Sequence, residues 1–139
     1  MRVLVCGTRS YFNETFMRSV LEKLGKDTVI IEGEARGADS QARAVAESLG
    51  LVVEKYPAEW NKYGRSAGFV RNTQMLREGH PDEVYAFFED LKAYEKSKGT
   101  KNMIAQARRI FIPVTIFISG NALILDEFYI WLERAKKEV

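Results

Sequence analysis

The feature that most constrains the fold is a glycine-containing octapeptide, residues 32–39 (EGEARGAD), which joins two segments with different patterns. Residues 28–31 before it are apolar and rich in β-branched side chains, which is typical of a buried strand. After it, apolar residues recur at helical spacing from Ala38 to Leu49. The octapeptide is therefore predicted to be the turn between a parallel strand and its crossover helix.

The same alternation of strand and helix patterns continues along the chain. Further strands are predicted at residues 2–6, 51–56, 83–88 and 113–118, with a short antiparallel edge strand at 122–125. Right-handed crossovers place the intervening helices on both faces of such a sheet. We therefore predict an α/β class: one domain over residues 1–139, with a Rossmann-like three-layer fold and a mostly parallel sheet of about five strands plus the edge strand. Residues 89–98 interrupt the pattern as either a lid or a surface excursion.

Composition narrows the function classes. The 21 Lys and Arg against 19 Asp and Glu give a net charge of +2, too balanced to indicate a nucleic acid partner. No apolar run is long enough to span a bilayer, so no membrane association is expected. The single cysteine, Cys6, predicts a buried structural thiol and a reducing cytoplasm. The octapeptide is neither a dinucleotide fingerprint nor a P-loop, and no cluster has metal-ligand spacing, so we predict no cofactor and no metal.

In a parallel sheet, ligands bind beyond the carboxyl ends of the strands, where the distinctive glycines and arginines of this chain gather. Arg36 and a helix N-terminus favour an anion there. We predict a phosphate or nucleotide site, with ordinary turns as the alternative, built from Gly7, Thr8, Arg9, Gly33, Glu34, Arg36, Gly37, Ala38, Asp39, Arg71, Asn72, Gly99 and Thr100. Asp39 would brace the arginine-containing turn or hold a ribose hydroxyl. Trp60 and Tyr63 would stack on a base or anchor their loop to the core.

These runs are similar, in order and spacing over residues 1–118, to the YspA-like branch of the SLOG superfamily, which is related to DprA and Lonely guy proteins. The runs that carry the resemblance are Gly7-Thr8-Arg9, Gly33 to Asp39, Arg71-Asn72 with Met75, and Gly99-Thr100 through Met103. The resemblance implies a Rossmann-like fold that binds nucleotides or nucleotide-derived ligands. This chain departs from the family's pattern in two places. Glu34 stands where the family usually has a second glycine, and residues 89–98 separate the fourth strand from Gly99-Thr100.

The main hypothesis is the binding or sensing of a nucleotide or nucleotide-derived ligand. The alternative is an N-glycosidic hydrolase of the phosphoribohydrolase kind, which needs a carboxylate at the anomeric carbon. Residues 101–104 contain no acid, so Glu34 and Asp39 are the catalytic candidates. Single-stranded DNA binding, suggested by the basic and aromatic residues 60–65, is weakened by the charge balance. Five consecutive bulky apolar residues, 128–132, predict a homodimer or higher homo-oligomer.

Overall fold

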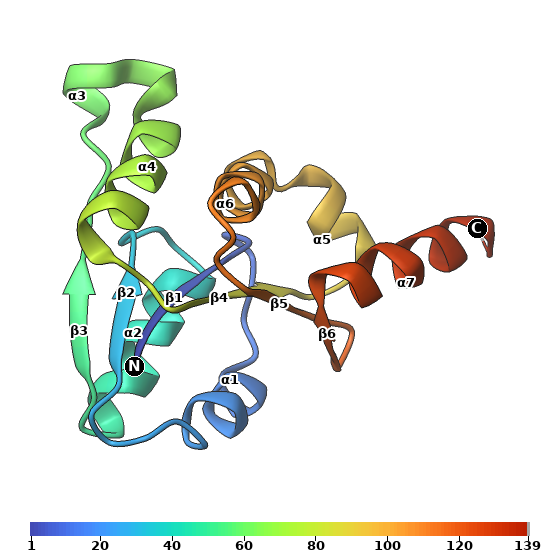
Figure 1. Ribbon diagram of the computed structural model, residues 1–139, viewed down its shortest axis with the longest axis horizontal. Helices are drawn as coiled ribbons and strands as arrows, with labels where there is room; N and C mark the ends of the chain where they lie inside the picture. The colour runs from blue at the N-terminus through green and yellow to red at the C-terminus, as the bar shows by residue number, and fades with distance from the viewer. Residues whose placement is uncertain (139) are drawn as a thin grey trace.

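The computed structural model describes residues 1–138, and its centre is one six-stranded sheet with the order β3-β2-β1-β4-β5-β6 (Figure 1). The strands are β1 (Arg2–Gly7), β2 (Val29–Glu32), β3 (Val52–Lys55), β4 (Glu83–Phe88), β5 (Val114–Ile118) and β6 (Asn121–Ile124). Neighbouring strands are parallel except for β5 and β6. In the centre of the sheet, Leu4 of β1 lies opposite Ile31 of β2 and Val84 of β4. The predicted α/β, Rossmann-like arrangement with an antiparallel edge strand is confirmed.

Helices cover both faces of this sheet. They are α1 (Glu14–Leu21), α2 (Ala38–Ser48), α3 (Trp60–Tyr63), the 3-10 turn η1 (Gly64–Ser66), α4 (Ala67–Gly79), α5 (Leu91–Lys96), α6 (Lys98–Arg109) and α7 (Leu125–Lys137). In Figure 1, α1 and α2 lie below the sheet, α4 to α6 lie above it, and α7 lies beside the β6 edge. No helix within residues 1–138 has the length and apolar character needed to cross a membrane.

Two hydrophobic clusters hold the layers together because side chains alternate between the faces of each strand. Val3 and Val5 of β1 pack with Met17 and Leu21 of α1 and with α2. Leu4 and Cys6, on the opposite face, belong to the cluster that contains α4, α6 and α7. Cys6 is buried, as predicted, and burial raises the pKa of its thiol.

Two segments carry more structure than their sequences predict. The loop expected at residues 58–64 contains α3 and η1, which form a projecting corner before α4 (Figure 1). Residues 89–98 contain α5, which Asp90 caps by accepting a hydrogen bond from the Ala93 N–H at 2.9 Å. Tyr94 fixes α5 to the core, because its ring packs edge-on against both Phe88 and Phe128.

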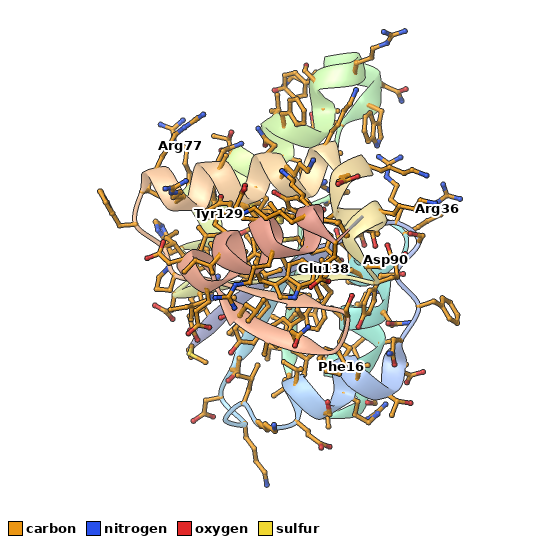
Figure 2. All side chains as sticks on the ribbon, turned by 90° about the vertical axis from the view of Figure 1, so that its right-hand side faces the viewer. Phe16, Arg36, Arg77, Asp90, Tyr129 and Glu138 are labelled. Atoms are coloured by element: carbon orange, nitrogen blue, oxygen red, sulfur yellow. The ribbon has the colours of Figure 1, made fainter. Side chains whose placement is uncertain are left out.

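The last helix buries most of its run of five bulky apolar residues, 128–132. Phe128 and Leu132 are buried, and Tyr129 and Trp131 are partly buried against the same cluster. Figure 2 shows Tyr129 on the side of α7 that faces the rest of the molecule. Of the five residues, only Ile130 is more than half exposed, at 59%.

Candidate functional site

The strand order places the candidate site between β1 and β4. The chain runs outward from β1 to β3 on one side and from β4 to β6 on the other, so the order reverses between these two strands. The turns that follow their carboxyl ends diverge there and leave room for a ligand. The turns after β1 and β2 and the amino-terminal parts of α4 and α6 meet at this edge.

The first turn is held tightly by its neighbours. A Cβ atom on Gly7 would collide with the Phe87 carbonyl oxygen, so the strand–turn junction requires glycine. The Gly7 carbonyl accepts a hydrogen bond from the Thr100 hydroxyl at 2.9 Å. The Thr8 carbonyl accepts one from the Ala38 N–H at 3.1 Å, which joins the first turn to the second. Gly7, Thr8, Ala38 and Thr100 are therefore brought together as predicted.

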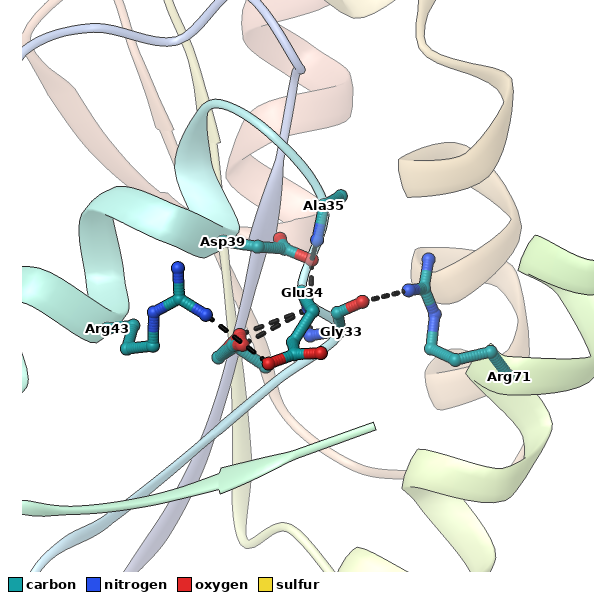
Figure 3. A network of polar contacts seen from close by, with 7 residues as sticks. Gly33, Glu34, Ala35, Asp39, Arg43 and Arg71 are labelled. Atoms are coloured by element: carbon teal, nitrogen blue, oxygen red, sulfur yellow. Dashed lines mark hydrogen bonds and ion pairs between the residues drawn. The ribbon is translucent and has the colours of Figure 1, made fainter. Parts of the chain in front are cut away.

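Two buried carboxylates organise the second turn (Figure 3). One Asp39 oxygen accepts hydrogen bonds from the Gly33 and Ala35 N–H groups at 3.1 and 3.3 Å. Both oxygens of Glu32 accept from the Glu34 N–H, at 3.1 and 3.0 Å. Asp39 thus braces the turn, which is the first of the two roles considered for it.

These bonds limit which backbone groups of the turn can meet an anion. The N–H groups of Gly33, Glu34 and Ala35 do not face a ligand, because Glu32 and Asp39 already accept from them. In residues 1–138, the Arg36 and Gly37 N–H groups donate no hydrogen bond. Within the second half of the octapeptide, Arg36 and Gly37 are therefore the residues that remain open to an anion.

Burial changes the protonation of both carboxyl groups. Removal from water raises the pKa of Glu32 to about 7, against the smaller opposing effect of its bond from Glu34. Burial also raises the pKa of Asp39 to about 6, although the Arg71 guanidinium and the two backbone N–H groups oppose it. A fraction of each carboxyl group is consequently neutral near pH 6, which lowers the repulsion of an approaching anion.

Arg71 and Asn72 join α4 to two other elements of the site. The Arg71 guanidinium donates to the Gly33 carbonyl at 2.5 Å, and a side chain at Gly33 would collide with it (Figure 3). The buried Asn72 amide donates to the Gly99 carbonyl at 3.0 Å and to the Asn102 side chain at 3.1 Å. Gly99 and Thr100 lie in the first turn of α6, so this helix begins at the site, as expected.

The three remaining predicted residues differ in their surroundings. Glu34 has a left-handed backbone with φ of 57°, and its carboxylate forms an ion pair with Arg43 at 3.3 Å. A glycine adopts this conformation without strain, which is a physical reason for a glycine to be usual at this position. Arg36 is exposed and projects into solvent in Figure 2, and it makes no ion pair or hydrogen bond within residues 1–138. Arg9 lies over the ring of Trp60.

Glu89 is a site residue that the sequence analysis missed. It follows β4 directly, and its carboxylate accepts hydrogen bonds from the Thr8 hydroxyl and, at 2.5 Å, from the Ser10 hydroxyl. It therefore closes the gap between the β1 and β4 turns. Its position as the first residue after a predicted strand was the available signal. Within residues 1–138, no group of three or more His, Cys, Asp or Glu side chains is placed to hold a metal ion.

The fold and this site define a Rossmann-like α/β protein whose polar groups converge where the strand order reverses. The model of the YspA, cpYpsA-related SLOG family matches residues 1–63. The chain is also 32% identical over 125 residues to the Gene 61 protein of Mycobacterium phage D29, an alignment that covers 84% of this chain and 95% of that protein. The chain belongs to the YspA-related SLOG family.

A solved structure supports the fold independently of close sequence similarity. The X-ray structure of DNA processing protein A (DprA) from Streptococcus pneumoniae matches 99% of this chain with a TM-score of 0.68 at 17% identity. The match covers 56% of the DprA chain, so this chain spans little more than half the length of that protein. The likeness bears on the fold alone.

Proposed function

We propose that this protein binds a nucleotide or nucleotide-derived ligand at the carboxyl edge of β1, β2 and β4, with a phosphate at the second half of the octapeptide. One observation carries the proposal. At an edge where Asp39, Asn72 and Thr100 are all bonded within the protein, Arg36 is a cation without an intramolecular partner in residues 1–138. Arginine binds phosphate through two parallel charge-assisted hydrogen bonds.

The deciding experiment is calorimetric titration of wild type, Arg36→Ala and Arg36→Lys with the four common nucleoside 5′-monophosphates. A charge-assisted bond to phosphate contributes about 1.5–3 kcal/mol, so Arg36→Ala should weaken binding about ten- to a hundredfold. Arg36→Lys should recover part of the loss, because a point charge cannot make the paired contact. Stability should change by less than about 0.5 kcal/mol.

Arg109 provides the matched control. Arg109 is also exposed. It is the last residue of α6, which leads into the amino end of β5, so it lies near the amino ends of the strands, opposite the candidate site. Arg109→Ala should leave nucleotide affinity unchanged. A lower melting temperature with unchanged affinity in Arg36→Ala would contradict the phosphate role and assign Arg36 to the structure of the turn.

Binding is favoured over N-glycosidic hydrolysis because the carboxylates near the site are already engaged. Asp39 holds two backbone N–H groups, Glu34 pairs with Arg43, and Glu89 accepts from two hydroxyl groups. An enzyme of this kind needs a carboxylate that is available to the anomeric carbon or its water. Release of free base from the same nucleotides, abolished by Glu34→Gln or Asp39→Asn, would establish the hydrolase instead.

We further propose that the protein self-associates and works in the cytoplasm. The exposed Ile130 of α7 supports the first, and the single buried thiol of Cys6 supports the second. The charge balance argues against a nucleic acid partner.

A further inference from the structure

The projecting corner formed by α3 presents two aromatic side chains that the core does not use. Trp60 is 50% exposed and Tyr63 is 38% exposed, and neither belongs to either hydrophobic cluster. If their role were to anchor the loop, burial against the core would be expected. Exposed aromatic rings beside a polar site have another use, which is to stack on planar ligands.

The two rings lie beside different parts of the site. The guanidinium carbon of Arg9, in the turn after β1, lies over the Trp60 ring, 6.0 Å from its centre. Tyr63 lines a cleft of about 560 Å³ along α4 together with Arg71, and has the Lys62 ammonium over its own ring at 5.1 Å. Trp60, not Tyr63, is therefore the aromatic residue that extends the site from the β1 turn.

The separation of Arg9 and Trp60 suits an inserted planar group. Stacked bases in nucleic acid lie about 3.4 Å apart, so a base between two planar groups needs about 7 Å. The guanidinium carbon now lies 6.0 Å from the ring centre, within the range of a cation–π contact and about 1 Å short of that span. Arg9 is exposed, and its long side chain can move by this amount.

Trp60 is supported on its other side. A Cβ atom added to Gly68, in the first turn of α4, would lie 3.8 Å from the edge of the Trp60 ring, which is ordinary contact distance. The start of α4 therefore borders the indole, while the exposed Arg9 side chain can adjust.

We propose that Trp60 and Arg9 form a clamp that stacks on the nucleobase of the ligand. This inference rests on the proposed function and adds a second part to it: the base contributes binding energy in addition to the phosphate. The clamp selects for a planar heteroaromatic group without selecting one base by hydrogen bonding, since every base has a stacking face. Ligands that carry only sugar and phosphate would leave it empty.

Fluorescence tests the clamp directly because the chain contains only two tryptophans. Trp131 lies on α7, and Trp131→Phe leaves Trp60 as the single indole. In this background, AMP should quench the Trp60 emission in a saturable way, and ribose 5-phosphate should not. In calorimetry, Trp60→Ala should weaken AMP binding about tenfold or more and leave ribose 5-phosphate binding unchanged. Trp60→Phe should retain most of the affinity.

Phe69 of α4 supplies the control, because it is a similarly exposed aromatic residue at 44%, and Phe69→Ala should bind both ligands like wild type. Equal affinity for AMP and ribose 5-phosphate, unaffected by Trp60→Ala, would overturn the clamp and leave the phosphate site standing. Failure of every nucleoside monophosphate and of ribose 5-phosphate to bind would overturn the proposed function and the clamp with it.

Discussion

Glu32 and Asp39 have similar roles in the second turn. Each is buried, and each accepts hydrogen bonds from backbone N–H groups of that turn. Burial of a carboxyl group favours its neutral form, so the pKa values rise to about 7 and about 6. The folded protein therefore binds protons more tightly at these two positions than the unfolded chain does. Folding and protonation are coupled through them.

This coupling gives a pH dependence of stability with a definite sign. The stabilising contribution is complete near pH 3, below the ordinary values of 4.5 and 3.8, and it is lost as pH rises through about 6 to 7. We expect the free energy of unfolding to fall by about 1–3 kcal/mol between pH 5 and pH 8, measured by urea denaturation. Glu32→Gln should flatten this slope, and the exposed Glu47→Gln on α2 should not. Parallel slopes for wild type and Glu32→Gln would rule out Glu32 as the source.

The roles of some site residues can be predicted from the sequence, and those of others cannot. The site positions of Arg36 and Asp39 follow from a βα turn that contains two glycines, and Asp39 was expected at the start of the helix. The burial of Glu32 could not be predicted, because the group that satisfies its carboxylate is a backbone N–H of the turn, that of Glu34, and not a side chain that the sequence would reveal. Glu89 was missed because its partners are the hydroxyl groups of Thr8 and Ser10, about 80 residues away in sequence.

At the scale of elements, the turns place the site and the helices support it. The bounds of α2 and β4 were predicted within one residue, because α2 has apolar residues at helical spacing and β4 is a short apolar run. The short helix α3 was missed because four residues are too few to show a helical period. Tertiary contacts stabilise α5, chiefly those of Tyr94 with Phe88 and Phe128.

Two glycines allow the cost of backbone strain to be distinguished from the cost of a steric collision when each is replaced by alanine. Gly37 and Gly50 both have φ of 76°, a value that residues with side chains rarely adopt, so alanine is strained at each. A Cβ atom on Gly37 would collide with the backbone of Thr8 and Arg9, whereas Gly50 faces open space. We expect Gly37→Ala to reduce the free energy of unfolding by about 1–3 kcal/mol more than Gly50→Ala, as measured by urea denaturation. Equal losses would mean that the first two turns are not rigidly packed together.

On the scale of the whole molecule, the sheet has two different edges. The β3 edge carries Val52 with 62% exposure, and the β6 edge is flanked by α7. Because α7 buries Phe128 and Leu132 within one chain, the apolar surface left for a partner there is smaller than the sequence suggests. Ile130 is the part of the run that remains available.

Self-association is expected to be weak and to depend on Ile130. Burying one isoleucine side chain contributes about 1.5–3 kcal/mol, so a dimer that relies on it should dissociate at micromolar concentrations. Sedimentation equilibrium should show Ile130→Lys shifted to monomer, while Val52→Lys, at the opposite edge of the sheet, should behave like wild type. A wild-type protein that remains monomeric even at millimolar concentration would refute the prediction, and so would an Ile130→Lys variant that associates like wild type.

The central position of β1 has a consequence for the chain during synthesis. Its first neighbour, β2, emerges soon after it, but its second, β4, ends at Phe88. Until then one edge of an apolar strand has no partner, and such edges invite pairing between chains. Premature release before residue 88 would leave this edge open. The hydrogen bond between Thr100 and Gly7, 93 residues apart in sequence, forms later still. The site is therefore complete, and able to bind a ligand, only after residue 100 has been synthesised.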